Sequence, residues 1–105
     1  MGTMTLQKVC DFDAVAEGSI IRVEVDGLPP LAVYKLDGEV YVTDDTCTHG
    51  DASLADGEIE DACVVCPYHM GAFDIKTGEP TAAPCTEALN VYAVTVQDGA
   101  VLIEV

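Results

Sequence analysis

Two short motifs, each with one cysteine and one histidine, constrain this chain more than any other feature. They are Cys47-Thr48-His49 and Cys66-Pro67-Tyr68-His69, and sixteen residues lie between His49 and Cys66. Four of the five cysteines and both histidines fall between Asp44 and Cys85. Thiolates and imidazoles are ligands that zinc and iron accept in proteins, so this stretch is a candidate metal site.

The rest of the chain has the pattern of short strands separated by turns. Apolar and polar residues alternate in several segments, as in half-buried strands, and no segment repeats apolar residues at helical spacing. Asp37-Gly38 predicts a tight hairpin turn, because glycine accepts positive φ. Pro80 and Pro84 lack backbone donors and predict a loop between them. The expected strands are 6–10, 19–25, 31–36, 39–43, 58–59, 62–65, 72–75, 89–96 and 100–105.

A length of 105 residues is typical of one domain, here residues 1–105. The strand pattern predicts an all-β fold with a β frame at both ends, about 1–43 and 86–105. The irregular middle, about 44–85, carries the two Cys–His motifs.

Charge excludes several classes of partner. Nineteen acidic side chains face four basic ones, for a formal net charge of −15. Nucleic-acid binding needs a basic patch, and anionic membranes repel such a chain. The acidic excess is consistent either with solubility alone or with steering toward basic sites on partners. No segment approaches the roughly 18 apolar residues of a membrane span, and the first residues do not resemble a signal peptide, so we expect the cytoplasm.

The residues alone leave two metal sites open. Two thiolates and two imidazoles make a tetrahedral zinc site, or they hold a two-iron, two-sulfide cluster with both cysteines on one iron. The pairs C-x-H and C-x-x-H suit the cluster, whereas zinc knuckles usually offer C-x₂₋₄-C. Cys63-Val64-Val65-Cys66 is such a pair, but Cys63 lies in an apolar strand, where we expect core packing. Cys10 is also expected in the core, and Cys85 as a packing residue or free thiol.

The motifs and their surroundings resemble the two cluster loops of Rieske iron–sulfur proteins. The resemblance extends over Cys47 to Asp51, Cys66 to Gly71 and the Pro80–Pro84 stretch, and it covers nearly the whole chain. It implies a fold of antiparallel sheets with an inserted cluster-binding subdomain and one [2Fe–2S] cluster. Cys47 and Cys66 would then ligate the inner iron, and His49 and His69 the outer one.

Three positions differ from the membrane-bound Rieske subunits and indicate which group of Rieske proteins the chain resembles. Ala52 and Tyr68 stand where those subunits have a disulfide, and Gly71 stands where a serine bonds the cluster. The chain is similar to the ferredoxins of bacterial systems that hydroxylate aromatic rings with a dioxygenase. This implies a monomeric one-electron carrier, not an enzyme, between a flavin-containing ferredoxin reductase and a terminal oxygenase. The missing serine implies a reduction potential at the low end of the Rieske range.

Two other functions remain open from the sequence. The small Rieske-like subunit of a nitrite reductase has a similar size, and a zinc-stapled interaction module would use the same four ligands. An acidic stretch separates the two motifs and is expected near the histidines, where partner docking is a hypothesis. Its members are Asp51, Asp56, Glu58, Glu60 and Asp61.

Overall fold

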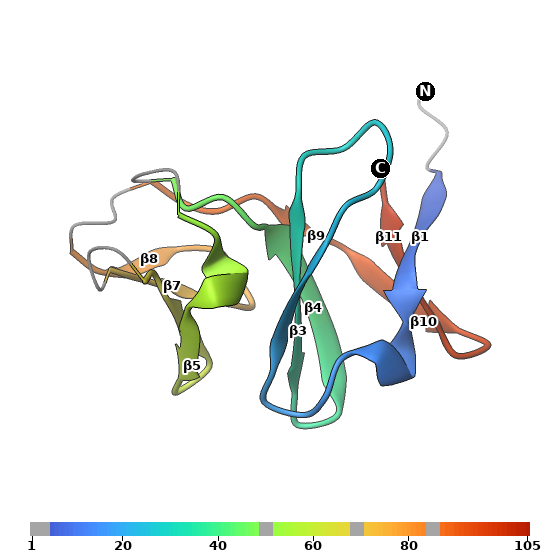
Figure 1. Ribbon diagram of the computed structural model, residues 1–105, viewed down its shortest axis with the longest axis horizontal. Coiled ribbons are helices and arrows are strands. Elements are labelled where there is room, and N and C mark those ends of the chain that lie inside the picture. The colour runs from blue at the N-terminus through green and yellow to red at the C-terminus, as the bar shows by residue number, and fades with distance from the viewer. Residues whose placement is uncertain (1–4, 49–51, 68–70, 84–86) are drawn as a thin grey trace.

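In the computed structural model of this protein, the described residues (5–48, 52–67, 71–83 and 87–105) form eleven short strands in three sheets (Figure 1). All strand pairs are antiparallel, which confirms the all-β prediction. The first sheet has the order β1-β11-β10, the second β2-β3-β4-β9 and the third β5-β6-β7-β8. The bounds are β1 (Leu6–Asp11), β2 (Ile20–Val23), β3 (Leu31–Leu36), β4 (Glu39–Asp44), β5 (Glu58–Glu60), β6 (Cys63–Val65), β7 (Ala72–Asp74), β8 (Pro80–Ala82), β9 (Val91–Tyr92), β10 (Val94–Gln97) and β11 (Ala100–Glu104), with 3₁₀ turns η1 (Phe12–Ala14) and η2 (Leu54–Asp56).

Strand β3 separates two hydrophobic cores, one on each face of the second sheet. Successive side chains of a strand point to opposite faces of its sheet. Ala32 and Tyr34 therefore lie in a cluster with the third sheet, while Leu31 and Val33 lie in a cluster with the first sheet. All four are fully buried. The second sheet is covered on both faces, as its place between the other two in Figure 1 shows.

The β3–β4 hairpin follows the turn signal in the sequence. Asp37 and Gly38 have φ values of 51° and 79°, as a type I′ turn requires. The exposed carboxylate of Glu17 accepts hydrogen bonds from the backbone N–H of Asp37 (2.7 Å) and Gly38 (2.8 Å). A residue distant in sequence therefore holds this turn.

Two expected segments differ in the structure. The predicted strand 89–96 is divided at Ala93: Tyr92 pairs with Val42 in the second sheet, whereas Val94 pairs with Ile103 in the first. The chain changes sheets at this point, so one apolar run serves two sheets. The predicted loop after Pro80 begins as the short strand β8, which pairs only with β7 among the described strands. Proline is tolerated there because β8 is an edge strand.

A close backbone approach at Gly57 lies where η2 leads into β5, the first strand of the third sheet. A Cβ atom at Gly57 would lie 2.0 Å from the carbonyl oxygen of Val65 and 3.2 Å from that of Leu54. Neither neighbour is a flexible side chain, so the backbone itself would have to move. The absence of a side chain at Gly57 therefore fixes how η2 and β5 pack against the strand that leads to Cys66.

We expect the Gly57→Ala variant to lower the free energy of unfolding by about 3 kcal/mol, because the added methyl group overpacks a backbone contact. Gly27→Ala is the control: Gly27 has φ +83°, where any other residue is strained, but a Cβ there meets nothing within 4 Å. That variant should cost only about 1 kcal/mol. Urea denaturation followed by circular dichroism measures both, and equal costs would refute the close-approach argument.

Candidate metal centre

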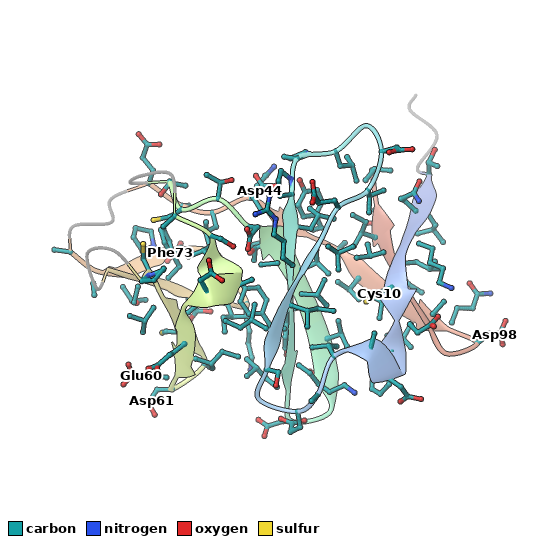
Figure 2. The ribbon with its side chains drawn as sticks, viewed as in Figure 1. Cys10, Asp44, Glu60, Asp61, Phe73 and Asp98 are labelled. Atoms are coloured by element: carbon teal, nitrogen blue, oxygen red, sulfur yellow. The ribbon has the colours of Figure 1, made fainter. Side chains whose placement is uncertain are left out.

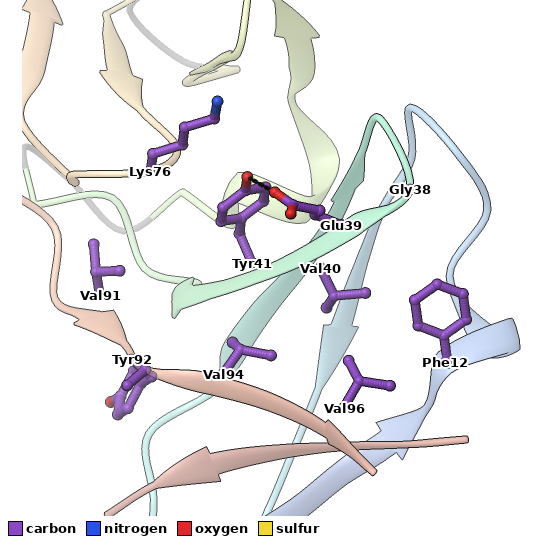
Figure 3. A pocket seen from close by; sticks show the side chains of 11 residues that line it. Phe12, Gly38, Glu39, Val40, Tyr41, Lys76, Val91, Tyr92, Val94 and Val96 are labelled. Carbon is purple, nitrogen blue, oxygen red and sulfur yellow. Dashed lines mark hydrogen bonds between the residues drawn. The ribbon is translucent and has the colours of Figure 1, made fainter. Parts of the chain in front are cut away.

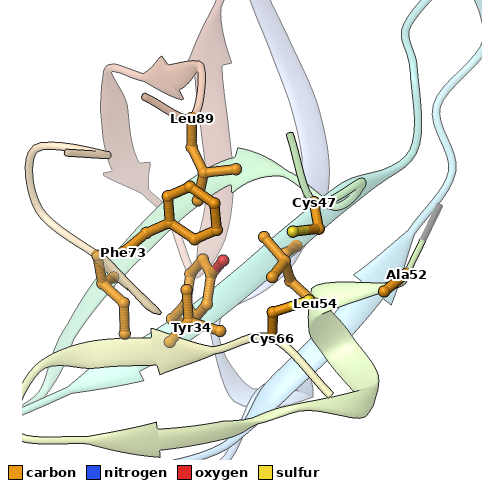
Figure 4. Close-up of a cluster of buried hydrophobic side chains, with 10 residues drawn as sticks. Tyr34, Cys47, Ala52, Leu54, Cys66, Phe73 and Leu89 are labelled. Carbon is orange, nitrogen blue, oxygen red and sulfur yellow. The ribbon is translucent and has the colours of Figure 1, made fainter. Parts of the chain in front are cut away.

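Cys47 and Cys66 come together in one core although they lie on different hairpins. Cys47 follows the end of β4 and Cys66 follows the end of β6. Their exposed fractions are 2% and 1%, and both belong to the hydrophobic cluster shown in Figure 4. The other buried members of that cluster are Ala32, Tyr34, Ala52, Leu54, Val64, Phe73, Ile75 and Leu89.

Each of the two cysteines begins a loop that its own amide closes. The N–H of Cys47 donates to the carbonyl of Ala52 (3.0 Å), and the N–H of Cys66 donates to the carbonyl of Gly71 (2.7 Å). Both loops therefore span five residues from the cysteine to its acceptor. His49 falls within the first span and His69 within the second, and both histidines lie outside the described residues. The two Cys–His motifs thus occupy equivalent places in two similarly closed loops.

This donor set fits a [2Fe–2S] cluster with mixed ligands. A buried thiolate in apolar surroundings is costly unless a cation compensates its charge. Cys47 and Cys66 share such surroundings, so a metal group bound by both would satisfy them together. One imidazole from each motif would complete the two-cysteine, two-histidine set that Rieske centres use.

Cys63 is not paired with Cys66 in the manner of a zinc knuckle. Strand β6 holds Cys63 in extended backbone, which places the Cα atoms of Cys63 and Cys66 about 10 Å apart at about 3.3 Å per residue. Its sulfur accepts a hydrogen bond from the hydroxyl of Thr81 on β8 (3.6 Å). Cys63 is half-buried rather than fully in the core.

Cys10 is also half-buried, on β1, where burial raises the pKa of its thiol. The expectation that Cys63 and Cys10 are core residues is therefore only partly met. Cys85 lies outside the described residues.

Asp45 supports the first cysteine loop and was not singled out by the sequence. Its side chain is 2% exposed, and its carboxylate accepts hydrogen bonds from the Ser53 hydroxyl (2.5 Å) and the Ala55 N–H (2.9 Å). Its carbonyl accepts from the Leu54 N–H (2.7 Å). The guanidinium of Arg22 lies 3.8 Å away and partly balances the charge. Asp45 therefore ties the end of β4 to the segment that returns from the loop.

Two tyrosine hydroxyls, one buried and one half-buried, form hydrogen bonds in the second sheet beneath the site. The hydroxyl of Tyr34 lies 2.8 Å from that of Thr43, and the Thr43 hydroxyl donates to the Asp44 carbonyl (2.9 Å). Burial raises the pKa of Tyr34 far above its usual value, so its hydroxyl stays a neutral donor. On the neighbouring strand, Tyr92 donates to the Asp44 carboxylate (2.6 Å). Burial, with help from that bond, raises the pKa of Tyr92 to about 12.

The acidic stretch between the motifs is divided in space. Asp56 and Glu58 line a hollow of about 240 Å³ together with Cys66 and Pro67. Glu60 and Asp61 lie instead at the tip of the β5–β6 hairpin (Figure 2), at the opposite end of β6 from Val65. The strand direction therefore carries Glu60 and Asp61 away from Cys66, whereas the expectation that the stretch lies near His49 and His69 stays a prediction. Asp51 lies outside the described residues.

A larger hollow of about 700 Å³ opens between β4 and β10 (Figure 3). Its walls are mainly apolar and aromatic, from Phe12, Tyr41 and Val94 among others. Tyr41 donates to the Glu39 carboxylate there (2.8 Å). The residues that line it include no cysteine or histidine, so this hollow is not the metal centre.

Within the described part of the chain, no helix has the length and apolar character that crossing a bilayer would require.

Comparisons with known proteins show the family of this chain. The model of the Rieske [2Fe–2S] domain family matches residues 5–93. The ferredoxin component of the p-cumate 2,3-dioxygenase system of Pseudomonas putida is 44% identical over 98 residues, which are 92% of this chain and 83% of that protein. The solved ferredoxin of Sphingomonas yanoikuyae B1 has a TM-score of 0.92 and 42% identity, covering 96% of this chain and 99% of its own.

Two further structures bear on the choice between functions. The ferredoxin in a complex of reduced oxygenase and oxidised ferredoxin in carbazole 1,9a-dioxygenase has a TM-score of 0.87 and 44% identity, over 93% of this chain and 91% of that one. A nitrite reductase small subunit shares the fold, with a TM-score of 0.82, but only 26% identity over 94% of this chain and 97% of its own. By sequence identity, the chain is therefore more similar to this dioxygenase ferredoxin than to the nitrite reductase subunit. The chain belongs to the Rieske [2Fe–2S] family, among its small ferredoxins, and holds one [2Fe–2S] cluster.

Proposed function

We propose that this protein is the electron-carrying ferredoxin of a dioxygenase system that hydroxylates aromatic rings. It accepts one electron from a flavin-containing ferredoxin reductase and delivers it to a terminal oxygenase. The relatives that share over 40% of its sequence are named as ferredoxins of such systems, and one is seen in complex with an oxygenase. The protein itself is an electron-transfer component and not a catalytic enzyme.

The burial of two cysteines in one core, at the start of two similarly closed loops, is the observation that carries this function. It supports Cys47 and Cys66 as ligands of the inner iron, with His49 and His69 as ligands of the outer iron. The bound cluster supplies a one-electron couple, at a potential that the two imidazoles raise above that of an all-cysteine cluster. The apolar side chains around Cys47 and Cys66 exclude water from the two sulfur atoms.

The same observations support a division of the single domain 1–105 into a frame, about 1–43 and 86–105, and a cluster-binding subdomain, about 44–85. Among the described strands, β5 to β8 pair only with one another. The third sheet and the two cysteine loops then form one body, held on the second sheet by the core around Tyr34. A carrier of this kind works as a monomer in the cytoplasm, where it meets its partners in turn.

Partner docking is supported by the distribution of charge. Each basic side chain already contacts a neighbour: Lys8 and Arg22 face aspartates, and Lys35 and Lys76 lie over aromatic rings. The hollow beside Cys66 has two acidic residues, Asp56 and Glu58, and no basic residue among those that line it. This favours a docking face that attracts a basic patch on the reductase.

The first prediction concerns the ligands. The reduced protein should give a rhombic EPR signal and contain about two irons and two sulfides per chain. Cys66→Ser and His69→Ala should abolish or strongly alter that signal, because each removes one iron ligand. Cys63→Ser and Cys10→Ser are matched controls and should keep both the signal and the iron. One zinc per chain with no sulfide in protein prepared without air would overturn the proposal.

The second prediction concerns the reduction potential. Glycine at position 71 offers no hydroxyl to the cluster, and losing such a hydrogen bond destabilises the reduced, more negative form. Redox titration followed by circular dichroism should therefore give a potential near the low end of the Rieske range, about −150 mV. A potential well above zero would show that other groups supply the missing hydrogen bonds.

The third prediction concerns docking. The double variant Asp56→Lys, Glu58→Lys should slow reduction by the reductase about tenfold at low ionic strength, because steering of the encounter is lost. Added salt should shrink the difference between the variant and the parent protein.

The matched control is Glu24→Lys with Glu60→Lys, which changes the net charge equally at exposed positions away from the hollow. Its rate, measured by stopped flow, should stay within about twofold of the parent. If the two double variants slow reduction equally, net charge alone and not this face guides docking.

A further inference from the structure

A buried negative charge lies at the base of the first cysteine loop. The carboxylate of Asp45 accepts hydrogen bonds from the Ser53 hydroxyl and from the Ala55 N–H, on either side of Leu54. The Leu54 side chain is fully buried and belongs to the same hydrophobic cluster as the two cysteines proposed as ligands (Figure 4). The carboxylate is therefore held against a segment that lines the metal centre.

The path from Asp45 to the metal centre is short and apolar. Asp45 comes two residues before Cys47, so their Cα atoms lie within about 7 Å of each other at about 3.3 Å per residue. The side chains of Ala52 and Leu54, which pack around Cys47, are 2% and 0% exposed. Because such an interior screens a charge much less than water does, the charge of Asp45 acts strongly on any group that Cys47 binds.

One cation opposes this charge, and it is placed differently. The Nε atom of Arg22, on β2, lies 3.8 Å from a carboxylate oxygen of Asp45. The Arg22 side chain is 48% exposed, whereas that of Asp45 is 2% exposed. Water therefore screens the guanidinium more than the carboxylate, and the field of this pair inside the core is mainly that of the negative charge.

We propose that Asp45 lowers the reduction potential of the cluster and that Arg22 partly opposes this effect. The inference rests on the ligand set and the electron-carrying function proposed above. Reduction adds one negative charge to the cluster, and a fixed negative charge nearby raises the free energy of the reduced form. A lower potential makes the protein a stronger electron donor to its oxygenase. Asp45 thus sets the strength of the donor without binding the metal.

Asp45→Asn tests this directly, because it removes the charge and keeps the shape. The asparagine oxygen can accept from the Ala55 N–H, and its amide group can donate to the Ser53 hydroxyl. At a fixed applied potential and a fixed pH, the ratio of reduced to oxidised protein should be about tenfold higher than in the parent. Redox titration with small mediators, followed by visible circular dichroism, measures this ratio and involves no docking partner.

Arg22→Gln should shift the same ratio the opposite way. Its loss leaves the carboxylate unopposed, and the ratio should fall about twofold, since the guanidinium is half exposed and already screened. Arg22→Lys keeps the positive charge and should match the parent. A residue with a purely structural role would not give shifts of opposite sign in these two partners.

Asp56→Asn is the matched control for burial. Asp56 is exposed and lines the hollow beside Cys66, so it too is a carboxylate close to a proposed ligand. Its neutralisation should change the ratio less than twofold, and about 0.5 M salt should abolish even that change. The shift in Asp45→Asn should persist at the same salt, because buried charges are screened much less.

Equal shifts in Asp45→Asn and Asp56→Asn would overturn the inference. So would shifts of the same sign in Asp45→Asn and Arg22→Gln, since a loosened loop and not a charge would then be the cause. If Asp45→Asn does not fold, Arg22→Gln decides alone, and an unchanged or higher ratio overturns the inference. A parent protein without a [2Fe–2S] signal would refute the ligand assignment itself, so the two failures are distinguishable.

Discussion

The placement of two thiols in one dry core is the constraint on which the rest of the structure depends. Cys47 and Cys66 come from hairpins in different parts of the chain, and both must reach the same apolar cluster. This cluster needs apolar side chains beneath the two cysteines, and β3 supplies them with Ala32 and Tyr34. The opposite face of β3 must then be covered as well, and the first sheet covers it with Val101 and Ile103. A small chain thus builds two cores to present one pair of sulfur atoms.

Backbone hydrogen bonds close the two cysteine loops at their described ends. The closing bonds at Cys47 and Cys66 use main-chain groups on both sides, so they do not depend on which side chains the loops carry between their ends. Side-chain support acts from below, where the Asp45 carboxylate bonds to the Ser53 hydroxyl and the Ala55 N–H. Both kinds of support act on the ends of the loops, at residues that the structure describes.

Sequence patterns predicted the parts of this fold that local chemistry determines. The Asp37-Gly38 turn, the β3–β4 hairpin and the all-β class follow from φ preference and alternation, and the structure confirms them. The division of residues 89–96 at Ala93 was not predictable, because the sheet that each half joins depends on strands elsewhere. Asp45 was missed for a similar reason, since its partners become neighbours only after the loop has folded.

The candidate site divides in the same way. Ligand types and spacing identified the motifs, and the burial of Cys47 and Cys66 agrees with them; the places of His49 and His69 stay a prediction. The spacing of residues in the sequence does not show in which direction a strand runs relative to the site. Glu58 and Glu60 are two residues apart in one strand, yet Glu58 faces Val65 beside Cys66, whereas Glu60 pairs with Cys63 toward the hairpin tip. An acidic run in sequence is therefore not an acidic patch in space, because only the members at the strand end next to Cys66 lie beside that cysteine.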